Sequence, residues 1–106
     1  MKKAVIYAKA KTVFGVRLQI KKAQRYAKKH NLDIIAIHSD YDLQTVDTNA
    51  LPELIKMQSR AFDERFNYLL VNRKTIISKD VERLIAIESY LDRLRIKIVS
   101  VSKREL

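Results

Sequence analysis

A tyrosine, expected to be packed with its hydroxyl hydrogen-bonded, and two lysines able to bind an anion lie at the end of the first apolar run of the sequence. The run Lys3 to Ala8 is short and is bounded by lysines, a pattern typical of a strand buried on both faces of a sheet. It brings Tyr7, Lys9 and Lys11 to its C-terminal end, where open α/β sheets build their sites. If Lys79, which follows a later strand, lies at the same edge, the ammonium groups would form a shallow phosphate-binding site.

Other kinds of site have weaker support in the sequence. Gly15 is the only glycine, so neither a dinucleotide-binding fingerprint nor a P-loop can be written. His30 and His38 have no partner at metal-ligand spacing, and Ser39, beside His38, has no third group at a recognisable spacing. Because His38 stands at a strand end, we expect it to be packed or hydrogen-bonded. Three carboxylates share one polar segment, at Asp40, Asp42 and Asp47. We expect this segment to be a solvated loop, and we expect no metal site and no cofactor.

Length and charge limit the class of protein. With 106 residues the chain is expected to form one domain, and 22 Lys and Arg against 12 Asp and Glu give a net charge of +10. Such an excess favours a polyanionic partner or an acidic protein surface. There is no cysteine, nothing resembles a signal peptide, and the apolar stretches are too short to span a membrane. A cytoplasmic location is therefore expected.

The chain alternates strands and helices. Four strands are expected, at Lys3 to Ala8, Leu32 to His38, Asn67 to Val71 and Arg95 to Val101. Three helices are expected between them, from about Val16 to His30, from near Leu51 to before Phe66, and from Ser78 to about Leu94. The order βαβαβαβ predicts an α/β fold with three αβα layers and a four-stranded parallel sheet. Its first strand would be central, and the loops that hold Lys11, Asp40 and Thr75 would share one edge.

Apolar periodicity indicates which face of the first helix is buried. The inner stripe consists of Val16, Ile20, Ala23 and Ala27. Basic residues fall between these positions, at Lys21, Lys22, Arg25, Lys28 and Lys29. We expect the basic face to be solvated and the helix to end at His30 and Asn31, where a cation and a residue tolerant of positive φ are favourable.

The last helix is expected to start at an N-cap formed by Ser78. Asp80 and Glu82 would then lie in its first turn, near the positive end of the helix dipole. The predicted buried stripe consists of Val81, Leu84, Ile85 and Leu91. Ile87 would flank this stripe, and Glu88 would lie at its margin.

Several segments at matching separations carry a resemblance to a known family. The first strand ends in Tyr7-Ala8-Lys9-Ala10-Lys11, Gln19 opens the first helix, and the second strand ends at Asp40. The third strand and its exit loop read FNYLLVNRKTIISKD, and the last strand reads RIKIVSV. In these segments the chain resembles the catalytic domain of resolvase/invertase-type serine recombinases over nearly its whole length.

The resemblance implies a fold and a reaction, but the positions that carry the reaction differ. In that family a serine hydroxyl attacks a DNA phosphodiester while arginines neutralise the developing charge. The corresponding positions here are Lys9, Lys11, Gln19, Thr75, Ile76 and Lys79. Lys11 stands in the place of the serine, and Thr75 and Ile76 replace an Asp-Arg pair. An ammonium group is not a nucleophile and Ile76 cannot bind a phosphate, so we expect no catalytic residue.

Three functions remain open from the sequence. The first is an inactive relative of the recombinases that binds DNA or a full-length recombinase, as a regulator or as a remnant of a mobile element. Weak, non-specific DNA contacts would come from Lys9, Lys11, Lys79, Arg73 and Lys74. The second is a protein interaction module without DNA contact, and the third is a different α/β enzyme that uses the segment Asp40 to Asp47. The expected protein partner is a full-length recombinase or a second copy of the chain, and the domain 1–106 is expected to lack the family's C-terminal DNA-binding region.

Overall fold

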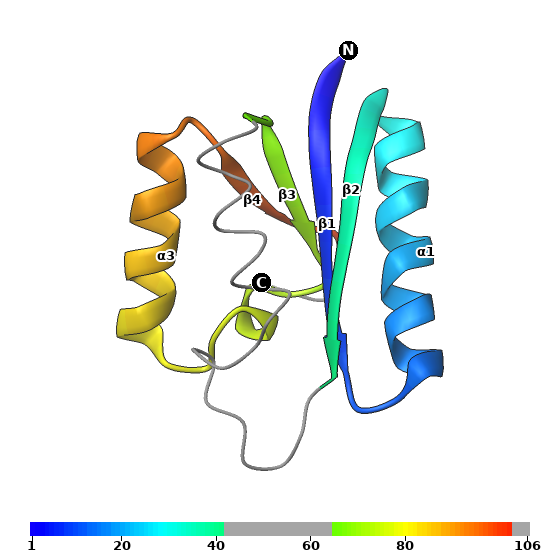
Figure 1. Cartoon of the computed structure of the whole chain (residues 1–106), viewed down its shortest axis with the longest axis horizontal. Coiled ribbons are helices and arrows are strands. Elements are labelled where there is room, and N and C mark those ends of the chain that lie inside the picture. Colours follow the sequence, from blue (N-terminus) through cyan, green and yellow to red (C-terminus); the bar gives the residue numbers. More distant parts are fainter. Residues whose placement is uncertain (42–64, 103–106) are drawn as a thin grey trace.

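The computed structural model describes residues 1–41 and 65–102, and these form a sheet with a helix on each face (Figure 1). The strands are β1 (Lys2–Ala10), β2 (Leu32–Tyr41), β3 (Tyr68–Val71) and β4 (Lys97–Ser100). The helices are α1 (Val13–Lys29), the short 3-10 helix η2 (Lys74–Ile76) and α3 (Val81–Arg93). The helix expected from near Leu51 lies outside the described residues.

The sheet has the predicted parallel arrangement. Its order is β2-β1-β3-β4, so β1 has a neighbour on both sides and is central, as expected from the sequence. The pairing of β1 with β2 is the longest, from Lys2 opposite Leu32 to Ala10 opposite Tyr41. The register shifts by one residue after Ala4, because Ile34 is opposite Ala4 while Ala36 is opposite Val5.

Alternation along β1 divides the core into two layers. Ala4 and Ile6 pack with Ala23 and Ala27 of α1 on one face of the sheet. Val5 and Tyr7 belong to the other layer, which is closed by α3, as expected when successive side chains of a strand point to opposite faces. The residues of β1 from Ala4 to Ala8 are buried, so the strand lies in the middle of the molecule between the two layers.

Helix α1 confirms the predicted apolar stripe and begins three residues earlier than expected. Its N-cap is Thr12, whose Oγ1 accepts a hydrogen bond of 3.0 Å from the backbone N–H of Gly15. The helix ends where predicted, with His30 as C-cap and Asn31 at a φ of 56°. An added Cβ at Gly15 would lie 2.9 Å from Cβ of Ala10, so only glycine lets the first turn approach the end of β1 this closely.

Helix α3 corrects two predictions. Its N-cap is Asp80, whose carboxylate accepts a 3.0 Å hydrogen bond from the backbone N–H of Glu82, so the assignment of the cap to Ser78 was wrong. Val81 and Ile85 were expected to be buried but are 68% and 57% exposed.

The buried residues of α3 are Ile87 and Leu91, with Leu84 packed against the same layer. Their spacing of three and four residues defines one helical face. Ile85 follows Leu84 by one residue, which turns it about 100° away from that face. The apolar residues of this helix therefore outnumber the positions that the sheet can cover.

Strand ends also differ from the sequence prediction. Strand β2 continues to Tyr41, so Ser39 and Asp40 belong to the strand and not to a loop. Strand β4 is shorter than expected, because Arg95 has a φ of 62° and forms part of a turn before it. Within residues 1–41 and 65–102, no helix is long and apolar enough to cross a bilayer.

Candidate nucleic-acid interface at the carboxyl end of the sheet

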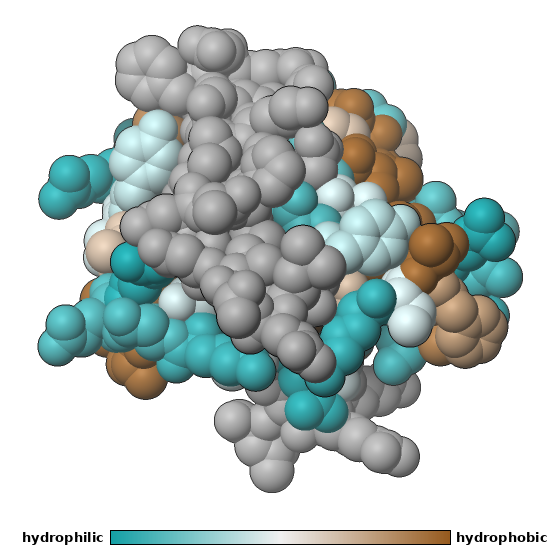
Figure 2. Space-filling view, turned by 60° about the horizontal axis from the view of Figure 1, so that its bottom comes forward, coloured by the Kyte–Doolittle hydropathy of each residue, from teal (hydrophilic) through white to brown (hydrophobic). Residues whose placement is uncertain are grey.

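The parallel sheet brings the segments singled out in the sequence to one end of the molecule. Lys11 lies between β1 and α1, Asp40 is near the end of β2, and Arg73 to Lys79 follow β3. Because the strands are parallel, all these segments leave the same edge. Figure 2 turns this end of the molecule toward the viewer, and its coloured part shows hydrophilic side chains together with hydrophobic ones.

Tyr7 and Asp40 form a buried hydrogen bond at this end. The Tyr7 hydroxyl donates to Oδ2 of Asp40 over 2.8 Å, and the two residues are 1% and 4% exposed. Tyr7 is therefore packed and hydrogen-bonded. Asp40 was predicted to lie in a solvated loop, but it is buried in β2, so that prediction is wrong. A buried carboxylate needs hydrogen-bond donors, and the Tyr7 hydroxyl is one of them.

The register shift between β1 and β2 makes this contact possible. After the shift Tyr7 is opposite His38 and Lys9 is opposite Asp40, so Tyr7 and Asp40 lie on the same face of the sheet. If the register of Ala4 and Ile34 continued unshifted past Ile35, Tyr7 would be opposite Ile37, and the carboxylate of Asp40 would point to the other face. The register shift therefore decides which side chain of β2 can hydrogen-bond to Tyr7.

Gln19 holds the backbone of Lys9 with both ends of its amide. Its Oε1 accepts from the backbone N–H of Lys9 at 3.0 Å, and its Nε2 donates to the backbone carbonyl oxygen of Lys9 at 2.8 Å. The sequence marked Gln19 only through its resemblance to a recombinase position. Its role as a clamp on the end of β1 follows from α1 packing against that strand, which no local pattern reveals.

The basic residues of this end differ in exposure. Lys11, Arg73 and Lys79 are exposed, whereas Lys9 is half-buried. The Lys74 ammonium lies 3.3 Å from Oε2 of Glu88 on α3. Glu88 is at the margin of the helix face, as predicted, and it draws Lys74 toward α3.

The segment after β3 is anchored by its apolar residues. Ile77 is fully buried, and Ile76 packs against the core layer between the sheet and α3. Ser78, 2% exposed, accepts a 3.1 Å hydrogen bond from the backbone N–H of Asp80 through its Oγ. Thr75 is exposed. The segment therefore exposes the side chains of Thr75 and Lys79 to solvent, while Ile76 faces the core.

Of the acidic and histidine side chains considered for a metal site, those that the structure describes lie apart or have other contacts. Asp40 is bound to Tyr7, and His38 is buried in β2. Asp42 and Asp47 lie outside the described ranges. Within residues 1–41 and 65–102, no group of three or more His, Cys, Asp or Glu side chains is placed to hold a metal ion.

Comparisons with known proteins identify the fold. No protein-family model matches the chain, and no curated protein sequence matches it significantly. Solved structures do match. The chain superposes on the C-terminal catalytic domain of ISC1926 TnpA, an IS607-like serine recombinase, with a TM-score of 0.82 and 20% identity over 98% of this chain and 70% of that one.

Two further structures agree with this match. The N-terminal catalytic domain of TP901-1 integrase gives a TM-score of 0.83 at 19% identity, over 94% of this chain and 77% of that one. A resolvase family site-specific recombinase from Streptococcus pneumoniae gives 0.80 at 10% identity, over 95% of this chain and 72% of that one. The chain therefore has the α/β fold of the serine recombinase catalytic domains, as the resemblance in its sequence predicted.

Proposed function

We propose that this protein is a catalytically inactive, recombinase-like domain that binds the DNA backbone through the carboxyl end of its sheet. The observation that carries the proposal is that the end of β1 is held by hydrogen bonds while lysines stand at the positions where the recombinase resemblance implies reactive groups. The end of β1 is held by the Gln19 clamp and by the buried pair of Tyr7 and Asp40. The side chains that follow this scaffold are Lys9 and Lys11.

Lysines suit phosphate binding without phosphoryl transfer. An ammonium group is a point charge that attracts a phosphate but lacks the fixed two-pronged geometry of arginine. Phosphoryl transfer to a protein nucleophile depends on positioning and on charge stabilisation. Removal of the nucleophile together with the groups that stabilise the charge lowers the reaction rate by many orders of magnitude. Lys11 at the place of the nucleophile and the inward-facing Ile76 together support binding without cleavage.

Binding is tested by a DNA mobility-shift assay over a series of salt concentrations. Duplex DNA of unrelated sequences should bind with similar affinity, and log K should fall with log salt at about −0.9 per phosphate contacted. The triple change Lys9→Ala, Lys11→Ala, Lys79→Ala should flatten this slope. The triple change Lys21→Ala, Lys22→Ala, Lys28→Ala on α1 removes the same charge and should matter less. The proposal fails if the α1 variant is the one that loses binding, or if the wild type does not bind at low salt.

Inactivity is tested separately on supercoiled DNA. Neither the wild type nor Lys11→Ser should leave a protein-DNA adduct after denaturation, because Ile76 still supplies no positive charge. An adduct formed by the wild type would contradict the inactive assignment. An adduct formed by Lys11→Ser alone would show that the remaining site is still competent for transfer.

A regulatory role follows if the domain also contacts a full-length recombinase. Such a contact should be measurable by mixing the protein with an active recombinase of the same cell and following the rate of recombination. A change in rate that persists in the Lys9, Lys11 and Lys79 variant would favour protein contact over competition for DNA.

A further inference from the structure

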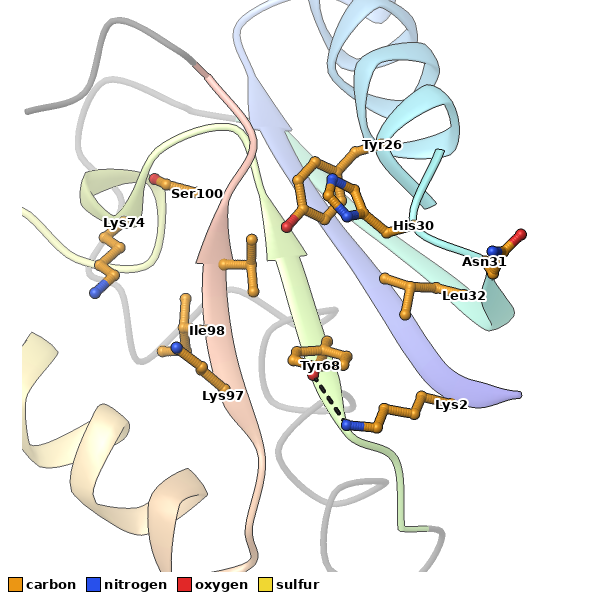
Figure 3. A pocket seen from close by; sticks show the side chains of 11 residues that line it. Lys2, Tyr26, His30, Asn31, Leu32, Tyr68, Lys74, Lys97, Ile98 and Ser100 are labelled. Atoms are coloured by element: carbon orange, nitrogen blue, oxygen red, sulfur yellow. Dashed lines mark hydrogen bonds between the residues drawn. The ribbon is translucent and has the colours of Figure 1, made fainter. Parts of the chain in front are cut away.

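A groove lies on the face of the sheet that carries α1, and it runs from the amino ends of the strands along β4 to Ser100 and Lys74. Helix α1 packs mainly on β1 and β2, so the β3 and β4 part of this face is not covered by it. The groove has a volume of about 700 Å³, within the range of ligand-binding clefts. Figure 3 shows its lining side chains, which come from α1, the sheet and the segment after β3.

Two lysines flank a tyrosine across three neighbouring strands in this groove. Tyr68 is opposite Ala4 of β1 and opposite Lys97 of β4, and Lys2 precedes Ala4 by two residues on the same face. The Lys2 ammonium is 3.4 Å from the Tyr68 hydroxyl oxygen and 5.6 Å from the centre of its ring. Strand register therefore produces a cation-aromatic-cation row, with both lysines exposed and the ring half-buried.

Two more rings come from the last turn of α1. The rings of Tyr26 and His30 lie 4.1 Å apart between centroids, tilted by 32°. Figure 3 shows them projecting from α1 over the sheet on one side of the groove, with Tyr68 and Lys2 further along it. Aromatic side chains thus line the groove at two places, with positive charge beside them.

The charge of the lining is one-sided. Among the lining residues that the structure describes, none is acidic, and three are lysines. Glu88 outside the groove engages Lys74, which leaves Lys2 and Lys97 as the ammonium groups that define its charge. A ligand that suits the groove carries negative charge at intervals and flat rings between the charges.

We propose that this groove binds single-stranded nucleic acid, with bases stacked on Tyr68 and Tyr26 and phosphates close to Lys2 and Lys97. Stacking on aromatic side chains combined with a basic track is the usual way in which proteins hold single strands. A duplex hides the faces of its bases and would leave the rings unused. A simple anion would use the lysines alone. The site is separate from Lys9, Lys11 and Lys79, so its test and that of the proposed function can fail independently.

The charge contribution is tested by fluorescence anisotropy with a labelled oligothymidylate of about 12 nucleotides, a length within the site sizes of single-strand binders. The double variant Lys2→Gln, Lys97→Gln should bind about 10-fold more weakly at low salt, and its log-log salt slope should be smaller by about 1.4, or 0.7 per lost phosphate contact. The matched control Lys21→Gln, Lys22→Gln removes the same charge from the outer face of α1 and should keep the wild-type slope. Equal losses in both variants would overturn the proposal, because net charge alone would then explain binding.

The stacking contribution is tested at Tyr68. Tyr68→Phe keeps the ring and should bind within about 2-fold of the wild type, whereas Tyr68→Leu should lose roughly 5- to 160-fold. Circular dichroism checks that both variants are folded, and if Tyr68→Leu is not, the lysine pair decides the question. The proposal is wrong if the wild type does not bind the oligonucleotide at low salt. It is equally wrong if duplex DNA, a phosphopeptide or thymidine monophosphate competes as well as the single strand.

Discussion

Replacement of Tyr7 by phenylalanine should destabilise the protein although no contact in the apolar core is lost. The change removes only the hydroxyl that donates to Asp40 at 2.8 Å, and the volume of the ring is kept. Both residues are at least 95% buried, so water does not easily replace the lost donor. Hydrogen bonds to charged groups contribute about 1.5 to 3 kcal/mol, and we expect the free energy of unfolding to fall by about 2 kcal/mol.

The measurement is urea denaturation followed by circular dichroism, supported by thermal unfolding. For a domain of this size a loss of about 2 kcal/mol should lower Tm by roughly 8 °C. The urea m-value should not change, because the surface exposed on unfolding is the same. Tyr90→Phe is the matched control. Tyr90 is 36% exposed on α3, and its change should cost less than about 0.5 kcal/mol.

A double-mutant cycle with Asp40→Asn tests whether the effect belongs to this pair. If the hydroxyl acts through the carboxylate, Tyr7→Phe should cost at least about 1 kcal/mol less in the Asp40→Asn background. Additive effects would show that the two side chains do not interact in solution. A cost of Tyr7→Phe below about 0.5 kcal/mol would likewise refute the reasoning.

Three further predictions concern the elements around the site. Gln19→Leu removes both hydrogen bonds to the backbone of Lys9 and should lower the free energy of unfolding by about 1 to 3 kcal/mol in urea denaturation; an unchanged midpoint would contradict the clamp. Leu91→Ala, at a fully buried position, should cost about 2 to 5 kcal/mol, while Ile85→Ala, at an exposed one, should cost less than about 0.5; equal costs would contradict the observed helix face. Asp80→Ala should lower the free energy of unfolding by about 1 kcal/mol, measured by thermal unfolding, because α3 loses its N-cap; an unchanged stability would show that Asp80 does not cap the helix.

Local patterns predicted the elements and the interior of α1 well. Val16, Ala23 and Ala27 are buried as their spacing requires, and the helix ends at His30 and Asn31. These features depend on residues within one or two turns of each other. The parallel sheet with a central first strand also followed from sequence, because the order of strands and helices leaves few permitted topologies.

Local patterns were less successful where a segment contained more apolar residues than its neighbours could cover. In α3, Val81 and Ile85 fit an apolar stripe as well as Ile87 does, but only Ile87 and Leu91 are buried. Helical spacing defines several overlapping faces. The position of the sheet relative to the helix selects one of them, and this is a tertiary property.

The sequence by itself determined the α/β fold, the basic character of the chain and the residues that end its first strand. Tertiary structure decided how those residues meet. Tyr7 and Asp40 are 33 positions apart, and they share a face only because one extra residue in β2 shifts the register. Lys2, Tyr68 and Lys97 come together in the same way, from the starts of three strands. The sequence specifies the type of each side chain. Contacts between distant residues depend on strand register, which is set by the packing of the whole core.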